Sequence, residues 1–136
     1  MGEDNYFVKR RHGNMEGNLN KSDKAKIHRG CYIDICGNIT IKDHAEISND
    51  VYIFTHKHHW KHSIGLRRDT QILEPIDLVI EEDAFIGVRS IIYGVERIGK
   101  GAIVGAGSVL TKSVPNYEIW AGNPAKKIGE RKKEKK

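Results

Sequence analysis

The sequence predicts an all-β domain made of stacked, three-sided coils of short parallel strands. The main observation is a repeat of six residues, in which a large aliphatic residue returns at every sixth position in two separate series. The second is the residue set, because β-branched residues dominate the repeats and glycine interrupts nearly every one, which disfavours a helix. The third is an aromatic content of only 7% beside 14 glycines, which points away from an aromatic-packed helical bundle.

The six-residue period predicts one short strand and one tight corner per repeat. It matches neither the 3.6-residue period of a helix nor the alternation of a half-buried strand. The aliphatic residue points inward, a small residue four positions later fits the crowded corner, and Gly or Asn accepts the unusual backbone angles there. Three units close a coil, and the two series supply about three coils. The first series is Ile35, Ile41, Ile47 and Ile53, and the second is Ile80, Ile86, Ile92, Ile98, Val104 and Leu110.

An interruption separates the two series. Ile53 and Ile80 are 27 residues apart, which is not a multiple of six, so a loop must leave the coil between them. We place this extruded loop at about residues 57–76. A loop of this length in a compact domain is usually functional or disordered, and its position after the densest polar cluster of the chain favours a function.

The charge of the chain is concentrated at its C-terminal end. One domain is expected from 136 residues, with a formal net charge of +5. Residues 126–136 contain seven Lys and Arg against two Glu, so the other 125 residues sum to zero. A nucleic-acid binder would spread its cations over a folded face, so we expect no nucleic-acid partner. We interpret the tail as a solvated chain end, with the alternative that its first part meets a phosphate-bearing ligand.

Neither a membrane segment nor a cysteine-based site is expected. No apolar run approaches the roughly 20 residues of a membrane span, and the N-terminus lacks signal-peptide character, so we expect a cytoplasmic protein. The two cysteines, Cys31 and Cys36, have no second pair and no Cys-x-x-His partner to complete a zinc site. We interpret both as reduced, buried residues.

Several motifs resemble those of a known family. The repeats Ile86-Gly-Val-Arg-Ser-Ile, Ile98-Gly-Lys-Gly-Ala-Ile and Val104-Gly-Ala-Gly-Ser-Val resemble the hexapeptide repeat of left-handed parallel β-helix proteins. Residues 103–115, Ile-Val-Gly-Ala-Gly-Ser-Val-Leu-Thr-Lys-Ser-Val-Pro, followed by Trp120-Ala-Gly-Asn-Pro-Ala-Lys, are similar to the C-terminal signature of the galactoside, maltose and xenobiotic O-acetyltransferases. The resemblance covers about residues 33–128.

The resemblance implies both a fold and a function. The fold is a left-handed parallel β-helix of about three coils with an extruded loop and a short C-terminal tail; its handedness comes from the resemblance alone, because parallel crossovers are usually right-handed. We expect an N-terminal extension at 1–26, the acyltransferase domain at 27–128 and a basic tail at 129–136. The implied activity moves acetyl from acetyl-CoA to a hydroxyl, or an amine, of a sugar-type acceptor. The implied assembly is a homotrimer with active sites between subunits, and no metal is expected.

A histidine cluster supplies the candidate general base. Four of the seven histidines lie within residues 55–62, where the first series ends. The acceptor must lose a proton as it attacks the thioester, and imidazole titrates near working pH. An ungapped alignment of residues 41–58 with the equivalent coil of the family places its catalytic histidine on His58. His56 is the second choice, and alternation along an extended strand places both on one face.

The resemblance also implies contacts to acetyl-CoA. It places backbone contacts at Ala106, further contacts at Thr111 and Lys112, and a phosphate contact at Lys126. Val88 takes a position near the thioester where relatives have small residues, and it can offer its backbone N–H. The alternative for Ala106 and Thr111 is an ordinary corner or core position.

The acceptor side is less closely matched. Trp60 matches a position that is often aromatic in relatives, where it would stack on a sugar ring or the pantetheine arm, or else pin the loop onto the coil. The Asn that lines the acceptor site of galactoside-type enzymes has no counterpart, and His28 lies near its position. The acidic acceptor contact of the family falls near Asp34 or Cys36. The identity of the acceptor is therefore not transferable.

Two other functions fit parts of the sequence. His-x-His spacing can chelate a metal, and γ-class carbonic anhydrases share the repeat and take histidine ligands from different coils, which here would add His28 or His44. A non-catalytic β-helix scaffold is the other alternative, and it predicts that His58→Ala leaves function intact. The C-terminal signature favours acetyl transfer.

Overall fold

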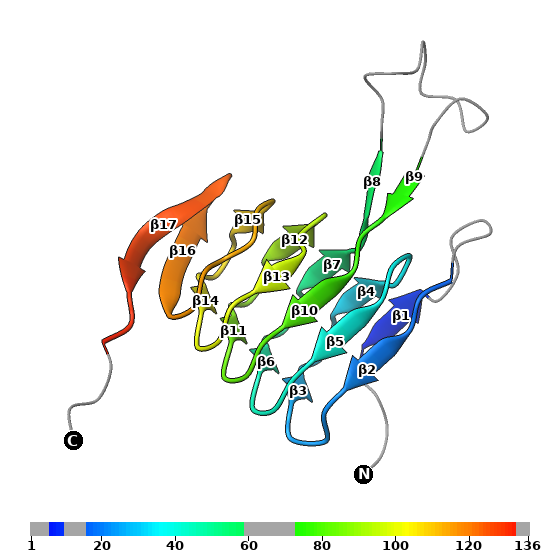
Figure 1. Ribbon diagram of the computed structural model, residues 1–136, viewed down its shortest axis with the longest axis horizontal. Coiled ribbons are helices and arrows are strands. Elements are labelled where there is room, and N and C mark those ends of the chain that lie inside the picture. Colours follow the sequence, from blue (N-terminus) through cyan, green and yellow to red (C-terminus); the bar gives the residue numbers. More distant parts are fainter. Residues whose placement is uncertain (1–5, 10–15, 59–72, 133–136) are drawn as a thin grey trace.

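The computed structural model of the chain is a three-sided coil of parallel strands stacked along one long axis (Figure 1). It describes residues 6–9, 16–58 and 73–132, and no helix in these ranges has the length and hydropathy to cross a membrane. The strands are β1 (Phe7–Lys9), β2 (Leu19–Lys21), β3 (Lys26–Ile27), β4 (Tyr32–Asp34), β5 (Ile39–Ile41), β6 (Glu46–Ile47), β7 (Tyr52–Phe54), β8 (His56–His58), β9 (Leu73–Pro75), β10 (Leu78–Ile80), β11 (Phe85–Ile86), β12 (Ile91–Tyr93), β13 (Arg97–Ile98), β14 (Ile103–Val104), β15 (Val109–Leu110), β16 (Glu118–Gly122) and β17 (Ala125–Glu130).

Three sheets form the walls of the coil. The first has the order β1-β4-β7-β12-β15, and the second has the order β2-β5-β10-β13. The third runs β3-β6-β11-β14-β16 and is extended by the antiparallel β17. Each turn of the chain adds one strand to every wall, and strands stack parallel on the strands of the turn before. The last turn is the exception, because it adds to the second wall only a single bridge between Val114 and Ile98. The all-β, parallel coil predicted from the six-residue period is confirmed.

The aliphatic series form the core. Every member of both series exposes 1% of its surface or less. Along the third wall Ile47 pairs with Ile86 and Ile86 with Val104, so inward side chains lie directly above one another. Burying each such side chain contributes roughly 1.5–3 kcal/mol, and the stacked columns make this contribution repeat in every coil.

The corners explain the small residues of the period. At three of the corners the residue just before the small residue has a left-handed backbone, with φ of 63° at His44, 60° at Asp83 and 65° at Gly101. The small residues that follow these three are Ala45, Ala84 and Ala102. Gly101 is also required by space, because a Cβ there would lie 2.5 Å from a ring carbon of Tyr117.

The turn of the coil from β4 to β7 is two residues longer than the period predicts. Ile33 pairs with Ile53, twenty residues later, whereas Ile92 pairs with Leu110, eighteen residues later. The extra residues lie between β4 and β5, where the backbone packs so closely that a Cβ on Gly37 would lie 2.1 Å from the carbonyl oxygen of Ile76. Ile35 is buried as predicted, but Ile33 is the residue in register with Ile53.

The walls begin earlier in the chain than the aliphatic series does. Strands β1, β2 and β3 pair with β4, β5 and β6, so the described residues hold more turns than the three that the series predict. Lys21 occupies the column position that Ile41 occupies in the next turn, and its ammonium donates to the Ser22 carbonyl. Because Lys21 stands where the next turn has an aliphatic residue, the six-residue repeat cannot be recognised in the sequence at this end of the stack. The domain boundaries at residues 27 and 128 stay predictions.

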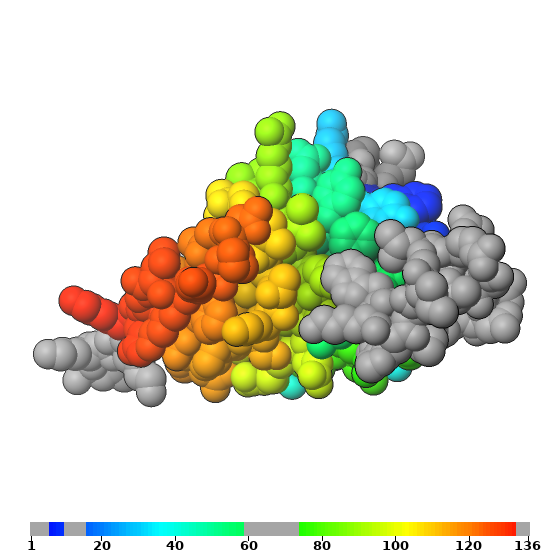
Figure 2. Space-filling view, turned by 90° about the horizontal axis from the view of Figure 1, so that it is seen from above, coloured from blue at the N-terminus to red at the C-terminus, as the bar shows by residue number. Residues whose placement is uncertain are grey.

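The C-terminal end of the stack is closed by a hairpin. Trp120 in β16 pairs with Val104, packs against the core and donates its ring N–H to Glu118. The β16–β17 hairpin lies at the opposite end of the long axis from β1, as the view from above shows (Figure 2).

A second hairpin leaves the coil at the interruption. Strands β8 and β9 form an antiparallel pair in which His56 is opposite Pro75 and His58 is opposite Leu73. The pair projects away from the walls (Figure 1), and the coil resumes at the buried Ile76 and at β10. The rest of the extruded loop, including Trp60, lies outside the described residues.

Candidate active site

The two candidate bases stand where the chain leaves the first wall. His56 follows β7 after a single residue, Thr55, and starts β8, which also holds His58. The side chain of His56 is almost fully buried, and its Nδ1 lies 3.0 Å from Oδ2 of the equally buried Asp34. Asp34 ends β4, one turn earlier in the stack. The structure thus brings together His56, His58 and Asp34, three of the residues singled out in the sequence.

Aromatic rings surround His56. The imidazole meets Phe54 edge-on at a centroid distance of 6.2 Å and Tyr93 at 6.1 Å, and the ring of His58 lies 5.0 Å away. Phe54 is in register with both Asp34 and Tyr93, so the acid and the two rings form one column of the first wall. These rings reduce the local polarity, which strengthens the electrostatic contact between Asp34 and His56.

Hydrogen bonds fix the backbone of this site. The hydroxyl of Thr55 donates to the Asp34 carbonyl at 2.7 Å and accepts from the Gly37 N–H at 3.1 Å. The N–H of Thr55 also donates to the Asp34 carbonyl, and the N–H of Gly94 donates to the Phe54 carbonyl. The positions of Asp34 and His56 relative to each other are therefore set by the main chain of two adjacent turns.

The predicted acetyl-CoA positions lie on the later turns of the stack. Val88 and Ala106 are exposed on adjacent corners, where the Gly107 N–H donates to the Val88 carbonyl at 2.8 Å. Thr111 and Lys112 are exposed just after β15. Lys126 is exposed in β17, at the C-terminal end of the stack.

The other acceptor-side candidates fall into different places. Nε2 of His28 lies 2.8 Å from Oε2 of Glu46 in the third wall, whereas the histidines of β8 follow the first wall. Cys36 is a buried thiol outside any disulfide, and burial, followed by the nearby Asp34 carboxylate, raises the pKa of this thiol. Cys31 is likewise a buried free thiol. Within residues 6–9, 16–58 and 73–132, no three His, Cys, Asp or Glu side chains are grouped as ligands for a metal ion.

Sequence reasoning missed the aromatic side of the site. Neither Phe54 nor Tyr93 belongs to the aliphatic series, and neither lies within the histidine cluster. The signal that would have found them is the position directly after an inward aliphatic residue. Phe54 follows Ile53 and Tyr93 follows Ile92, so pairing of β7 with β12 brings them together.

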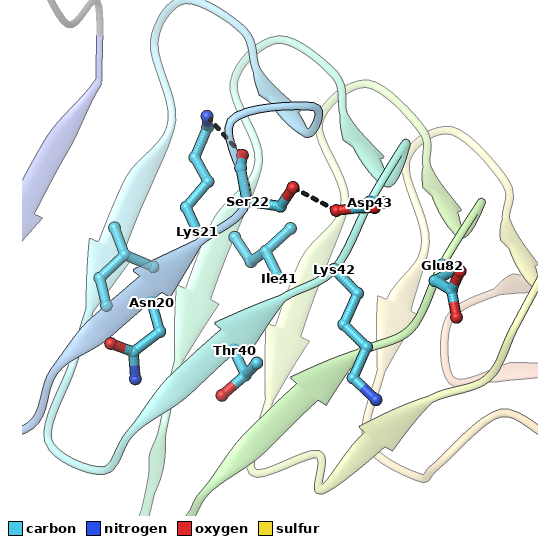
Figure 3. A pocket seen from close by; sticks show the side chains of 9 residues that line it. Asn20, Lys21, Ser22, Thr40, Ile41, Lys42, Asp43 and Glu82 are labelled. Carbon is cyan, nitrogen blue, oxygen red and sulfur yellow. Dashed lines mark hydrogen bonds between the residues drawn. The ribbon is translucent and has the colours of Figure 1, made fainter.

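A hollow lies elsewhere on the molecule. It has a volume of about 740 Å³ and is lined by residues of β2, β5 and the corner after each, together with Glu82, with none of the predicted site residues among them (Figure 3). Two of its charged side chains are engaged: Asp43 accepts a hydrogen bond from Ser22, and Lys42 lies 2.8 Å from Glu81. The hydrogen bond from Lys42 lowers the pKa of Glu81 against the opposing effect of burial. The hollow shows no feature of a reaction centre.

The three-walled coil and its six-residue period define the class of hexapeptide-repeat, left-handed parallel β-helix proteins, and the chain has this fold. Residues 77–112 match the family described as "Hexapeptide repeat of succinyl-transferase". The structure is similar to a maltose O-acetyltransferase from Clostridium difficile 630, with a TM-score of 0.68 and 25% identity over 94% of this chain and 67% of that one. The resemblance to hexapeptide-repeat acetyltransferases is thereby confirmed.

Two further proteins extend the comparison. A mutant of AntD, an N-acyltransferase from Bacillus cereus in complex with dTDP and coenzyme A, has a TM-score of 0.70 and 19% identity over 95% of this chain and 79% of that one. A 2,3,4,5-tetrahydropyridine-2,6-dicarboxylate N-acetyltransferase from Staphylococcus aureus is 47% identical over 51 residues, which is 38% of this chain. That match spans 21% of the curated relative, so its activity describes that protein and not this chain.

Proposed function

We propose that the protein is an acyltransferase that moves an acyl group, acetyl in the first instance, from acyl-CoA to a hydroxyl or amine of a sugar-containing acceptor. The observation that carries the proposal is the buried contact between Asp34 and His56 at the point where β8 leaves a hexapeptide-repeat coil. Solved structures of AntD contain coenzyme A together with dTDP or a dTDP-linked amino sugar, which supports the choice of donor and acceptor class.

The chemistry needs a base and donors for an oxyanion. An imidazole of β8 takes the proton of the acceptor as its oxygen or nitrogen attacks the thioester carbonyl. The negative charge on the tetrahedral intermediate requires nearby N–H donors, for which the exposed backbone of Val88 and Ala106 is suited. Collapse of the intermediate breaks the carbon–sulfur bond, and the imidazolium returns its proton to the departing CoA thiolate.

Acetyl-CoA binding is the experiment that tests this function without knowledge of the acceptor. We expect saturable binding by calorimetry, with a dissociation constant in the micromolar to millimolar range of enzyme substrates. Lys126→Ala should weaken binding by about 1 kcal/mol, or roughly fivefold, because an exposed ammonium would no longer meet a CoA phosphate. Absence of binding at millimolar acetyl-CoA would contradict the proposed function, and the histidines would then be titrated with zinc.

Lys127 provides the matched control for this experiment. It stands next to Lys126 in β17, but its ammonium lies 2.6 Å from Glu130 and 3.4 Å from Glu118. These contacts, the hydrogen bond to Glu130 first, raise its pKa. Lys127→Ala removes the same charge from the same strand, so we expect it to weaken acetyl-CoA binding less than Lys126→Ala does. Equal effects would indicate a general charge effect of the tail.

A homotrimer is part of the same proposal. The outward residues of the first wall form an in-register apolar column of Phe7, Tyr32, Tyr52, Ile91 and Val109. Its rings stack, with centroids 5.3 Å apart for Phe7 and Tyr32 and 5.8 Å apart for Tyr32 and Tyr52. Apolar columns of this extent on a surface are typical of subunit contacts.

Charge placed in this column should break the assembly. We expect wild-type protein to scatter light with three times the mass of the chain and Tyr52→Asp to shift it toward the monomer. Thr40→Asp is the control, because Thr40 occupies the outward position of the second wall, in register with Asn20 and Val79. A wild-type monomer at working concentration, or equal effects of the two variants, would contradict this assembly.

A further inference from the structure

We infer that Asp34 is a positioning residue that holds the imidazole of His56 in the tautomer and orientation of a general base, and that it selects His56 over His58 for this role. The inference rests on the proposed acyl transfer and deepens it. It also gives Asp34 a role other than the acceptor contact that the family resemblance implies.

Burial gives the contact its strength. The side chains of Asp34 and His56 expose only 4% and 7% of their surface. A carboxylate taken out of water is costly unless a donor or a cation compensates it. Oδ2 of Asp34 lies 3.0 Å from Nδ1 of His56, within the distance of an ion pair. The imidazole is thus a side chain that can compensate this buried carboxylate.

The main chain keeps the two side chains together. Thr55 directly precedes His56, and both its N–H and its hydroxyl donate to the carbonyl of Asp34. The same hydroxyl accepts from Gly37 in the corner that carries the two extra residues. Movement of His56 away from Asp34 would therefore break hydrogen bonds between two turns of the stack.

The contact determines which nitrogen can act as a base. A neutral imidazole has one N–H donor and one acceptor nitrogen. When Nδ1 carries the hydrogen and directs it at a carboxylate, the lone pair is on Nε2, and Nε2 is the atom that can take a proton from the acceptor. The edges of Phe54 and Tyr93 restrict rotation of the ring from the other sides.

The contact with His56 also argues against direct acceptor binding by Asp34. Oδ2 of Asp34 lies 3.0 Å from Nδ1 of His56, so the carboxylate faces the imidazole and not a sugar that arrives from solvent. His58 is more exposed than His56 and lies on the same strand, so it is the residue of the pair that is placed to touch a ligand. Because a general base must reach the proton that it takes, we assign proton transfer to Nε2 of His56 and further contact with the acceptor to the more exposed His58 beside it.

The imidazole tautomer tests the inference directly, without any assay of activity. In protein labelled with ¹⁵N at histidine, NMR should show His56 with the hydrogen on Nδ1 and an unprotonated Nε2. Asp34→Asn keeps the shape but removes the charge, and we expect it to mix the two tautomers. Asp43→Asn is the matched control, since Asp43 accepts a hydrogen bond from Ser22 on another corner, and it should leave the His56 signals unchanged.

Kinetics provide the second measurement. We expect Asp34→Asn to lower kcat on the order of 10²–10⁴-fold while the KM for acetyl-CoA stays within about twofold, and Asp43→Asn to change neither. A purely structural role of Asp34 would not move the tautomer in a folded variant. A wild-type His56 with its hydrogen on Nε2, or an Asp34→Asn variant with unchanged tautomer and kcat, would overturn the inference.

The outcomes separate the two proposals. The wild-type tautomer can be read even if Asp34→Asn does not fold, so the inference stays falsifiable. If acetyl-CoA does not bind, the proposed function fails while the tautomer still reports on the Asp34–His56 contact. If acetyl-CoA binds and the tautomer is the opposite one, the function stands and Asp34 has no positioning role.

Discussion

His56→Ala should lower the turnover of acyl transfer by roughly 10²–10⁴-fold, the usual contribution of a positioned general base. The reason is chemical: the acceptor must lose its proton during attack, and without the imidazole only water would receive it. The affinity for acetyl-CoA in calorimetry should change little, because the predicted donor contacts lie on later turns and in the C-terminal hairpin. The measurement is kcat with the best acceptor found in a screen of sugar-type alcohols and amines.

His58→Ala is the matched variant for this prediction. Both histidines are in β8, with ring centroids 5.0 Å apart, so removal of either perturbs the same hairpin. We expect His58→Ala to raise the KM for the acceptor more than it lowers kcat. A loss of kcat at His58 and not at His56 would instead favour the residue that the sequence alignment placed in the catalytic position. Unchanged turnover in both variants would favour a non-catalytic scaffold.

The choice between the two histidines shows what the sequence could and could not determine. A strict six-residue period makes a turn of eighteen residues, which would place Cys36 in register with Phe54. The turn is twenty residues long, so Asp34 takes that position. The two extra residues occupy a corner where close backbone packing, and not an aliphatic repeat, sets the path of the chain. The six-residue period of the aliphatic residues does not reveal such an insertion.

The same offset affects the acceptor side of the site. The sequence did not determine whether the acidic acceptor contact of the family falls at Asp34 or at Cys36. These positions are two residues apart, and the turn from β4 to β7 is longer than the period by the same two residues. The walls, the inward columns and the interruption were predictable, since each follows from where large aliphatic residues return. The contact between Asp34 and His56 and the rings of Phe54 and Tyr93 were not, because they depend on pairing between turns.

The stacked columns also lead to a large stability effect for Ile80→Ala. Ile80 is fully buried and lies between Ile41 and Ile98 in the column of the second wall. Truncation removes apolar contacts on both sides, and strands paired above and below cannot collapse into the space left. We expect a loss of about 2–5 kcal/mol in the free energy of unfolding, measured by urea denaturation at fixed protein concentration.

Val79→Ala is the control, because Val79 precedes Ile80 in β10 and faces outward on the same wall, where it is in register with Thr40 and Arg97. Both variants replace a β-branched residue in one strand, so they share any loss of strand propensity. The outward variant should lose about 1 kcal/mol or less. Similar losses in the two variants would mean that β10 is stabilised mainly by its backbone pairing. A loss confined to Ile80→Ala would show that the inward column stabilises the coil, because only that variant leaves a cavity between neighbouring turns.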